Sequence, residues 1–154
     1  WYYEQIELAL NYRLTDLQAA LGLSQLRRLE EFLRRRRELV ARYDRLLAGM
    51  SVQRPLVDLI EESAWHLYVI RIDPSRSGKT RREVYDAMRA AGIGVQVHYI
   101  PVHLQPYYRA LGFKPGHCPA AEHYAQEALS LPLYPAMTDR EQEAVVAALR
   151  KSLS

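Results

Sequence analysis

The stretch Asn11-Tyr12-Arg13-Leu14-Thr15-Asp16-Leu17-Gln18 decides how the first part of the chain folds. Thr15 and Gln18 have the spacing of a capping box, in which each side chain satisfies a backbone amide at a helix start. We therefore expect a helix to begin directly after Thr15. Asn11 and Arg13 then lie just outside a helix N-terminus, which attracts anions. The sequence thus predicts an anion-binding corner at this point.

The pattern that follows predicts a single long helix over 15–47, a rod of roughly 50 Å. Such a helix would connect two domains or run along a subunit interface. Gly22 costs about 1 kcal/mol relative to Ala inside a helix, so we expect another backbone to pack closely against it. The basic run 34–37 is expected to form a solvated helix face rather than a nucleic-acid patch. The apolar residues at helical spacing are Leu14, Leu17, Leu21, Leu26, Leu29, Leu33, Val40, Tyr43 and Leu47.

The rest of the chain mixes expected helices and strands, which indicates a small α+β layer attached to the long helix. Two more capping boxes, Thr80 with Glu83 and Thr138 with Glu141, predict helix starts. We expect helices over 80–91, 107–111, 119–129 and 138–149, strands over 66–72 and 95–97, a loop over 73–78 and an extended segment over 131–135.

Composition is that of an ordinary globular domain. The 154 residues are 49% hydrophobic and 25% charged, with a net charge of +3. No run approaches the roughly 18 apolar residues of a membrane span, and no nucleic-acid partner is indicated. The single Cys118 fits a reducing compartment, so we expect a cytoplasmic protein.

The segment His98-Tyr99-Ile100-Pro101-Val102-His103 is the strongest candidate for a ligand site. Two imidazoles and a phenol follow an expected strand, where side chains can converge on a ligand. A structural role for each histidine remains equally open at this point. Tyr107 and Tyr108 add aromatic surface nearby, suited to stacking on a base or a sugar.

Three other patterns indicate little chemistry. The segment 77–80 ends like a phosphate-binding loop, but Asp73 stands where that motif needs a glycine. The spacing of His117, Cys118 and His123 matches no familiar zinc pattern, and we expect Cys118 and Pro119 to start a helix instead. A Schiff-base lysine needs a setting that depresses its pKa. The chain's lysines, Lys79, Lys114 and Lys151, all lie in expected loops or at the C-terminus.

With these residues in view, the chain resembles the C-terminal part of the DegT/DnrJ/EryC1/StrS family of sugar-nucleotide aminotransferases. The similarity is greatest to members that aminate C4 of a UDP-linked 4-keto-6-deoxy sugar on the way to pseudaminic acid. The matching segments are 1–4, 11–26, 64–70, 96–108 and 129–134. The resemblance implies a fold-type I aminotransferase with pyridoxal phosphate (PLP) as cofactor. It also implies glutamate as amino donor and a homodimer.

The resemblance also implies roles for individual residues. Asn11 matches an asparagine that reaches the cofactor phosphate of the other subunit, and Arg13 an arginine near the anionic part of the substrate or donor. The loop residues His98, Tyr99 and His103 match substrate-binding positions that close over the nucleotide-sugar.

The resemblance further implies an incomplete active site. The family's Schiff-base lysine and large-domain sheet lie upstream of the matched part. We expect 1–50 to link to that large domain and 51–154 to form the small α+β domain, and we expect the isolated chain to be inactive. The alternative is a non-catalytic module that binds sugar nucleotides or self-associates.

Overall fold

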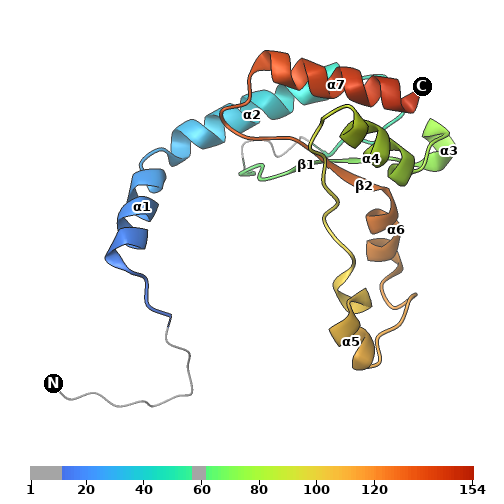
Figure 1. Cartoon of the computed structure of the whole chain (residues 1–154), viewed down its shortest axis with the longest axis horizontal. Coiled ribbons are helices and arrows are strands. Elements are labelled where there is room, and N and C mark those ends of the chain that lie inside the picture. Colours follow the sequence, from blue (N-terminus) through green and yellow to red (C-terminus); the bar gives the residue numbers. More distant parts are fainter. Residues whose placement is uncertain (1–11, 57–61) are drawn as a thin grey trace.

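The computed structural model describes residues 12–56 and 62–154. The described part forms an arch (Figure 1), with a packed core at the top and two extensions that descend from it. Helix α1 (Asp16–Leu26) forms one extension, and the segment that contains α5 (Pro106–Ala110) forms the other. Of the site residues predicted from the sequence, the four that the structure describes, Arg13, His98, Tyr99 and His103, lie on or next to these extensions.

The predicted long helix is interrupted. The structure has α1 and a separate α2 (Leu29–Leu46), joined at Arg27 and Arg28. Arg28 leaves helical geometry, pairs with Glu31 at 3.1 Å and lies over the Phe32 ring. Two physical reasons explain the break: α1 buries no residue, so no packing holds it in line, and acidic residues in the first turn of α2 favour a new helix start there.

The sheet has two short antiparallel strands, β1 (Tyr68–Arg71) and β2 (Ala128–Leu131). Tyr68 is opposite Leu131, and Arg71 is opposite Ala128. Single bridges flank both strands, Gln53 to Arg71 on one edge and Gln96 to Ser130 on the other. The expected strand over 95–97 is thus only a one-residue bridge, and β2 begins where we expected the end of a helix.

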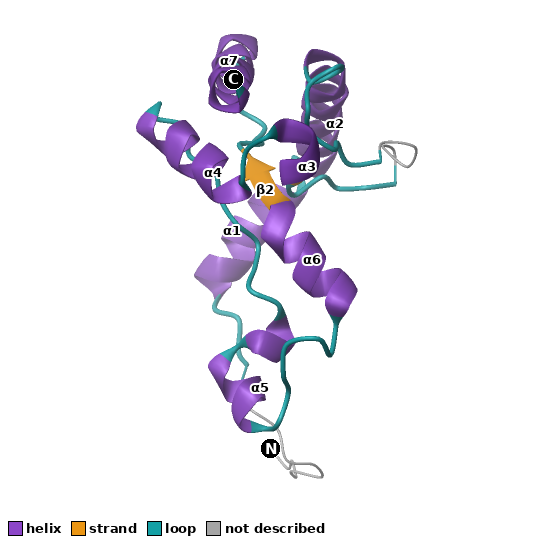
Figure 2. Ribbon diagram, turned by 90° about the vertical axis from the view of Figure 1, so that its right-hand side faces the viewer, coloured by secondary structure: helices purple, strands orange, loops and turns teal. Residues whose placement is uncertain are grey.

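Three helices cover one face of this sheet (Figure 2), namely α2, α4 (Arg81–Ala90) and α7 (Asp139–Leu153). Helix α7 packs against both α2 and α4. All three predicted capping boxes are present, at Thr15, Thr80 and Thr138. The core between these helices and the sheet includes Leu39, Val40, Tyr43, Tyr68, Ile70, Ile72, Val84, Met88, Leu129, Val145, Val146 and Leu149.

The remaining elements are a short helix between β1 and α4 and the elements of the second extension. The expected loop over 73–78 contains the single-turn helix α3 (Pro74–Ser77), which Asp73 caps. A short 3-10 turn, η1 (Val102–Leu104), precedes α5. Helix α6 (Pro119–Glu127) returns to β2 and begins after Cys118, as predicted. No helix within the described residues is both long and apolar enough to cross a membrane.

Of two expectations for the first helical region, one stays a prediction and one was partly wrong. Among the residues that the structure describes, nothing lies within 4 Å of a Cβ placed on Gly22, so the close approach of another backbone there stays a prediction. Arg36 is half-buried rather than fully solvated: its Nη1 donates to the carbonyl oxygens of Trp65, His66 and Leu133 at 3.0–3.2 Å, and burial lowers the pKa of its guanidinium. Arg34 behaves as predicted and pairs with Glu38 at 2.8 Å.

Candidate functional site

The second extension, which we call the arm and define as residues 98–118, carries three of the predicted site residues. It leaves the sheet just after the bridge between Gln96 and Ser130, and α6 brings the chain back to β2. Figure 1 shows α5 far below the sheet, at the tip of this loop. The two ends of the arm are therefore fixed by the core while its middle projects away from it.

His98 stands at the base of the arm and is held in place by β2. Its Nδ1 lies 2.8 Å from the hydroxyl of Ser130, which is only 4% exposed. The imidazole also makes an edge contact with the Tyr99 ring at 4.7 Å between centroids. The structure thus brings together the two adjacent residues of the predicted cluster.

Tyr99 is 70% exposed and borders a cavity of about 350 Å³ between the arm, α4 and α6. Apolar residues of the arm root, including Ile100 and Leu104, form part of its lining. Polar groups reach it from the helices, namely Arg81, Glu122 and Gln126. An aromatic ring beside a few polar groups suits a ligand with a flat, partly polar ring.

His103 is placed differently. It is 8% exposed, and its Nε2 lies 2.8 Å from Oε1 of Glu122 in α6. The same carboxylate accepts hydrogen bonds from the backbone amides of Gly116 at 2.8 Å and Cys118 at 3.4 Å. The hydrogen bond from His103, with those from the amides, lowers the pKa of Glu122. The hydrogen bond between His103 and Glu122 therefore joins the arm to α6.

The predicted anion-binding corner lies on the other extension. Asn11 is outside the described residues, whereas Arg13 is exposed just before α1. The capping box is formed as predicted, with Thr15 Oγ1 accepting from Gln18 N at 3.3 Å and Gln18 Oε1 accepting from Thr15 N at 3.0 Å. Helix α1 and the arm descend from opposite ends of the core (Figure 1). The structure therefore does not bring Arg13 and His98 together within one chain.

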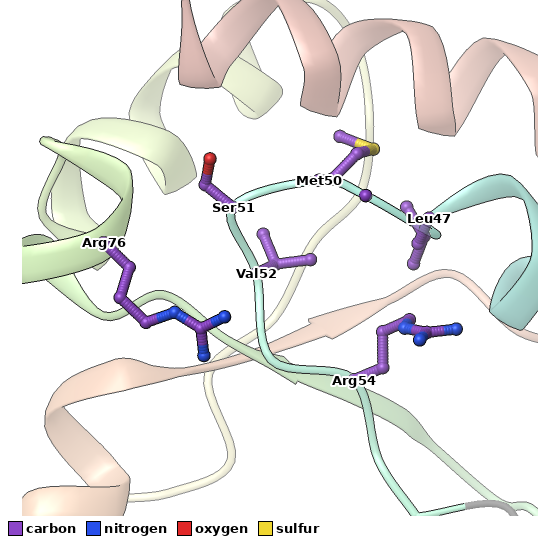
Figure 3. A pocket seen from close by; sticks show the side chains of 7 residues that line it. Leu47, Met50, Ser51, Val52, Arg54 and Arg76 are labelled. Atoms are coloured by element: carbon purple, nitrogen blue, oxygen red, sulfur yellow. The ribbon is translucent and has the colours of Figure 1, made fainter.

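A second cavity, of about 410 Å³, lies at the end of α2. Figure 3 shows the side chains of Arg54 and Arg76 beside Val52 in its lining. Arg54 is paired with Asp44 at 2.7 Å, and the charge of Arg76 lies near Asp73, whose pKa is lowered mainly by Ser75. The carboxylate of Asp44 thus compensates the charge of Arg54. Sequence reasoning did not predict this cavity.

A metal ion and a covalently bound cofactor each need a particular set of side chains. Within 12–56 and 62–154, no group of three or more His, Cys, Asp or Glu side chains is arranged to hold a metal. Lys114 and Lys151 are exposed, and Lys79 is half-buried in the loop before α4. None of these three lysines has the buried setting that a Schiff-base lysine requires.

Ser130 and Glu122 contribute to the site but were not predicted from the sequence. Ser130 interrupts an otherwise apolar run, Ala128 to Leu133, and such an interruption could have marked it. Glu122 lies early in the helix that Pro119 starts, where a carboxylate can reach free backbone amides. Their partners, 32 and 19 residues away, are visible only in the folded chain.

Comparison with known proteins places these observations in a family. The model of the DegT/DnrJ/EryC1/StrS aminotransferase family matches residues 1–150. The chain is 41% identical over 153 residues to the spore coat polysaccharide biosynthesis protein SpsC of Bacillus subtilis. That alignment covers 97% of this chain and 39% of SpsC, so the chain spans about two fifths of the relative's length.

Solved structures agree with this match. Spr1654 of Streptococcus pneumoniae, solved in PLP and pyridoxamine phosphate forms, superimposes with a TM-score of 0.88 at 31% identity, over 99% of this chain and 38–39% of that one. Helicobacter pylori PseC, an aminotransferase involved in the biosynthesis of pseudoaminic acid, gives 0.85 at 26% identity, over 97% and 40%. The predicted fold, part of a fold-type I aminotransferase, is confirmed. The chain belongs to the DegT/DnrJ/EryC1/StrS aminotransferase family.

Proposed function

We propose that this chain is the C-terminal part of a PLP-dependent aminotransferase that moves an amino group from glutamate to a 4-keto-6-deoxy UDP-sugar. The observation that carries this proposal is the match of nearly the whole chain to Spr1654, which was solved with both forms of the cofactor. The similarity to PseC supports a substrate on the way to pseudaminic acid. The His98 and Tyr99 pair beside a cavity supports the binding of a sugar nucleotide.

In this proposal the arm binds the sugar nucleotide. Tyr99 offers an exposed ring for stacking, and His98 offers a ring nitrogen for a hydrogen bond. His103 belongs to the same substrate-binding loop, and its bond to Glu122 sets the path of the arm. Because the cavity at Tyr99 also receives Arg81, a negatively charged ligand would meet a cation there.

The other extension serves a second subunit. Asn11 would reach the cofactor phosphate of the partner subunit, and Arg13 would contact an anionic group of the substrate or of glutamate. The exposed position of Arg13, on an extension that contacts neither the arm nor the core closely, supports a role across a homodimer interface.

The covalent chemistry belongs to the rest of the enzyme. Because the lysines of this chain are exposed or half-buried in a loop, we expect the PLP-bearing lysine in a large domain that precedes this part. Residues 1–50 would link to that domain, and 51–154 would form the small domain. We expect the isolated chain to be inactive and the whole enzyme to be cytoplasmic.

The test is amino transfer by the full-length protein. Incubation with a UDP-4-keto-6-deoxy sugar and glutamate labelled with nitrogen-15 should give an amino sugar that carries the label, detected by mass spectrometry. Replacing glutamate by aspartate, or UDP by TDP in the sugar, should lower the rate.

Two results would contradict the proposal. Labelling only from a donor other than glutamate would exclude the proposed donor. Binding of the UDP-sugar with no amination, in a protein that binds PLP normally, would indicate a binding module without transaminase activity.

A further inference from the structure

Ser130 is a buried hydroxyl in an otherwise apolar strand. Its neighbours in β2, Ala128, Leu129 and Leu131, are buried hydrophobic residues, and Ser130 itself is 4% exposed. Its backbone amide and carbonyl are both bonded to Gln96, at 2.8 and 3.2 Å. Packing alone would favour an apolar side chain here, so the hydroxyl requires a separate explanation.

The hydroxyl has one hydrogen-bond partner in the part of the chain that the structure describes, Nδ1 of His98 at 2.8 Å. A buried O–H proton needs an acceptor, and leaving it unbonded is costly. A neutral imidazole accepts at one nitrogen and donates from the other. If the Ser130 hydroxyl donates to Nδ1, then His98 carries its proton on Nε2.

We propose that Ser130 is a positioning residue that fixes His98 as the Nε2–H tautomer, so that His98 donates a hydrogen bond to a phosphate or sugar oxygen of the nucleotide-sugar. The inference rests on the proposed function of the arm. The bond also fixes the plane of the imidazole, because Nδ1 must face β2. Through the edge contact at 4.7 Å, the same bond positions the Tyr99 ring beside its cavity.

The first measurement is the tautomer of His98 in the full-length protein without substrate. Nitrogen-15 NMR of labelled histidine at about pH 8, where a free imidazole is neutral, reports which ring nitrogen carries the proton. The His98 signals are assigned by their loss in His98→Gln. We expect a protonated Nε2 in the unsubstituted protein and a mixture of tautomers in Ser130→Ala.

The second measurement is the affinity for UDP, by calorimetry. Ser130→Ala should weaken binding about tenfold, the effect of losing one hydrogen bond. Ser130→Thr keeps the hydroxyl and should restore affinity. Ser152→Ala is the matched control, because it removes a half-buried hydroxyl of α7 that bonds to Leu149 O at 2.8 Å away from the arm, and it should leave affinity unchanged.

The outcomes separate the inference from the function on which it rests. A protonated Nδ1 in the unsubstituted protein, or equal losses of affinity in Ser130→Ala and Ser152→Ala, would overturn the role of Ser130. Failure of the unsubstituted protein to bind UDP would overturn the proposed function, while the tautomer measurement would still decide whether Ser130 orients His98. If Ser130→Thr does not fold, the comparison of Ser130→Ala with the unsubstituted protein gives the answer alone.

Discussion

The core and helix α1 are built from similar leucine-rich sequence, yet they bury it very differently. Leu39 and Leu149 are fully buried between α2, α7 and the sheet. Leu17 and Leu21 in α1 are 83% and 63% exposed, and α1 has no buried residue. A helical apolar pattern therefore predicts a helix with an apolar face, but not what covers that face. The core buries its own apolar residues, whereas the leucines of α1 are exposed in this chain.

The largest expected loss of stability comes from a substitution in the core. Leu39→Ala removes a side chain that is fully buried and should destabilise the chain by about 3 kcal/mol. Leu21→Ala in α1 should change stability by less than about 0.5 kcal/mol in the isolated chain. Urea unfolding of the two variants measures the difference.

The stabilities of Leu39→Ala and Leu21→Ala should also be measured in the full-length enzyme. There, a partner surface on α1 should make Leu21→Ala clearly destabilising. An equal cost for Leu39→Ala and Leu21→Ala in the isolated chain would mean that α1 is packed after all, for example in a self-associated form. Sedimentation at several concentrations checks for that form.

A smaller loss of stability is expected at the helix starts, where α1 and α7 each carry a capping box. Thr138→Ala should lower the stability of the core by about 1 kcal/mol, because α7 packs on α2 and α4. Thr15→Ala removes the two hydrogen bonds of the Thr15 hydroxyl, one to Gln18 Oε1 and one from Gln18 N, but should leave the melting temperature unchanged. It should instead reduce the local helicity of α1, read from Cα chemical shifts. A matching loss of melting temperature in both variants would remove the distinction between the two helices.

The smallest expected change in stability is confined to the arm and depends on pH. Because His103 and the amides of Gly116 and Cys118 bond to the Glu122 carboxylate, its pKa lies below the usual value of about 4.3. A lowered pKa in the folded state means that these bonds contribute stability at neutral pH, and that this contribution is lost as pH falls through the folded pKa.

An NMR titration of the Gly116 amide measures this loss. We expect its shift to change with a midpoint below the usual pKa of a glutamate, while core amides stay unchanged in that range. In Glu122→Gln the midpoint should vanish. A Gly116 shift that follows the core signals would show that the arm and the core respond as one unit.

Local signals predicted the elements of the fold well and their partners poorly. The three Thr-to-Glu or Thr-to-Gln capping boxes depend on residues three apart, and all three formed. The break at Arg28 and the start of β2 at Ala128 depend on packing that the pattern does not contain. For the same reason, the sequence could mark His98 and His103 as candidate site residues. It could not indicate that His98 is hydrogen-bonded to Ser130 and His103 to Glu122.

The bridges at Gln53 and Gln96 have a consequence for how this chain behaves when it is handled alone. Exposed strand edges are templates for aggregation, and proteins often protect them by keeping the strands short or covering them. Here both strands are four residues long, and each outer edge is occupied at one position, at Arg71 and at Ser130. Solubility engineering should therefore leave the sheet intact and replace the exposed leucines of α1.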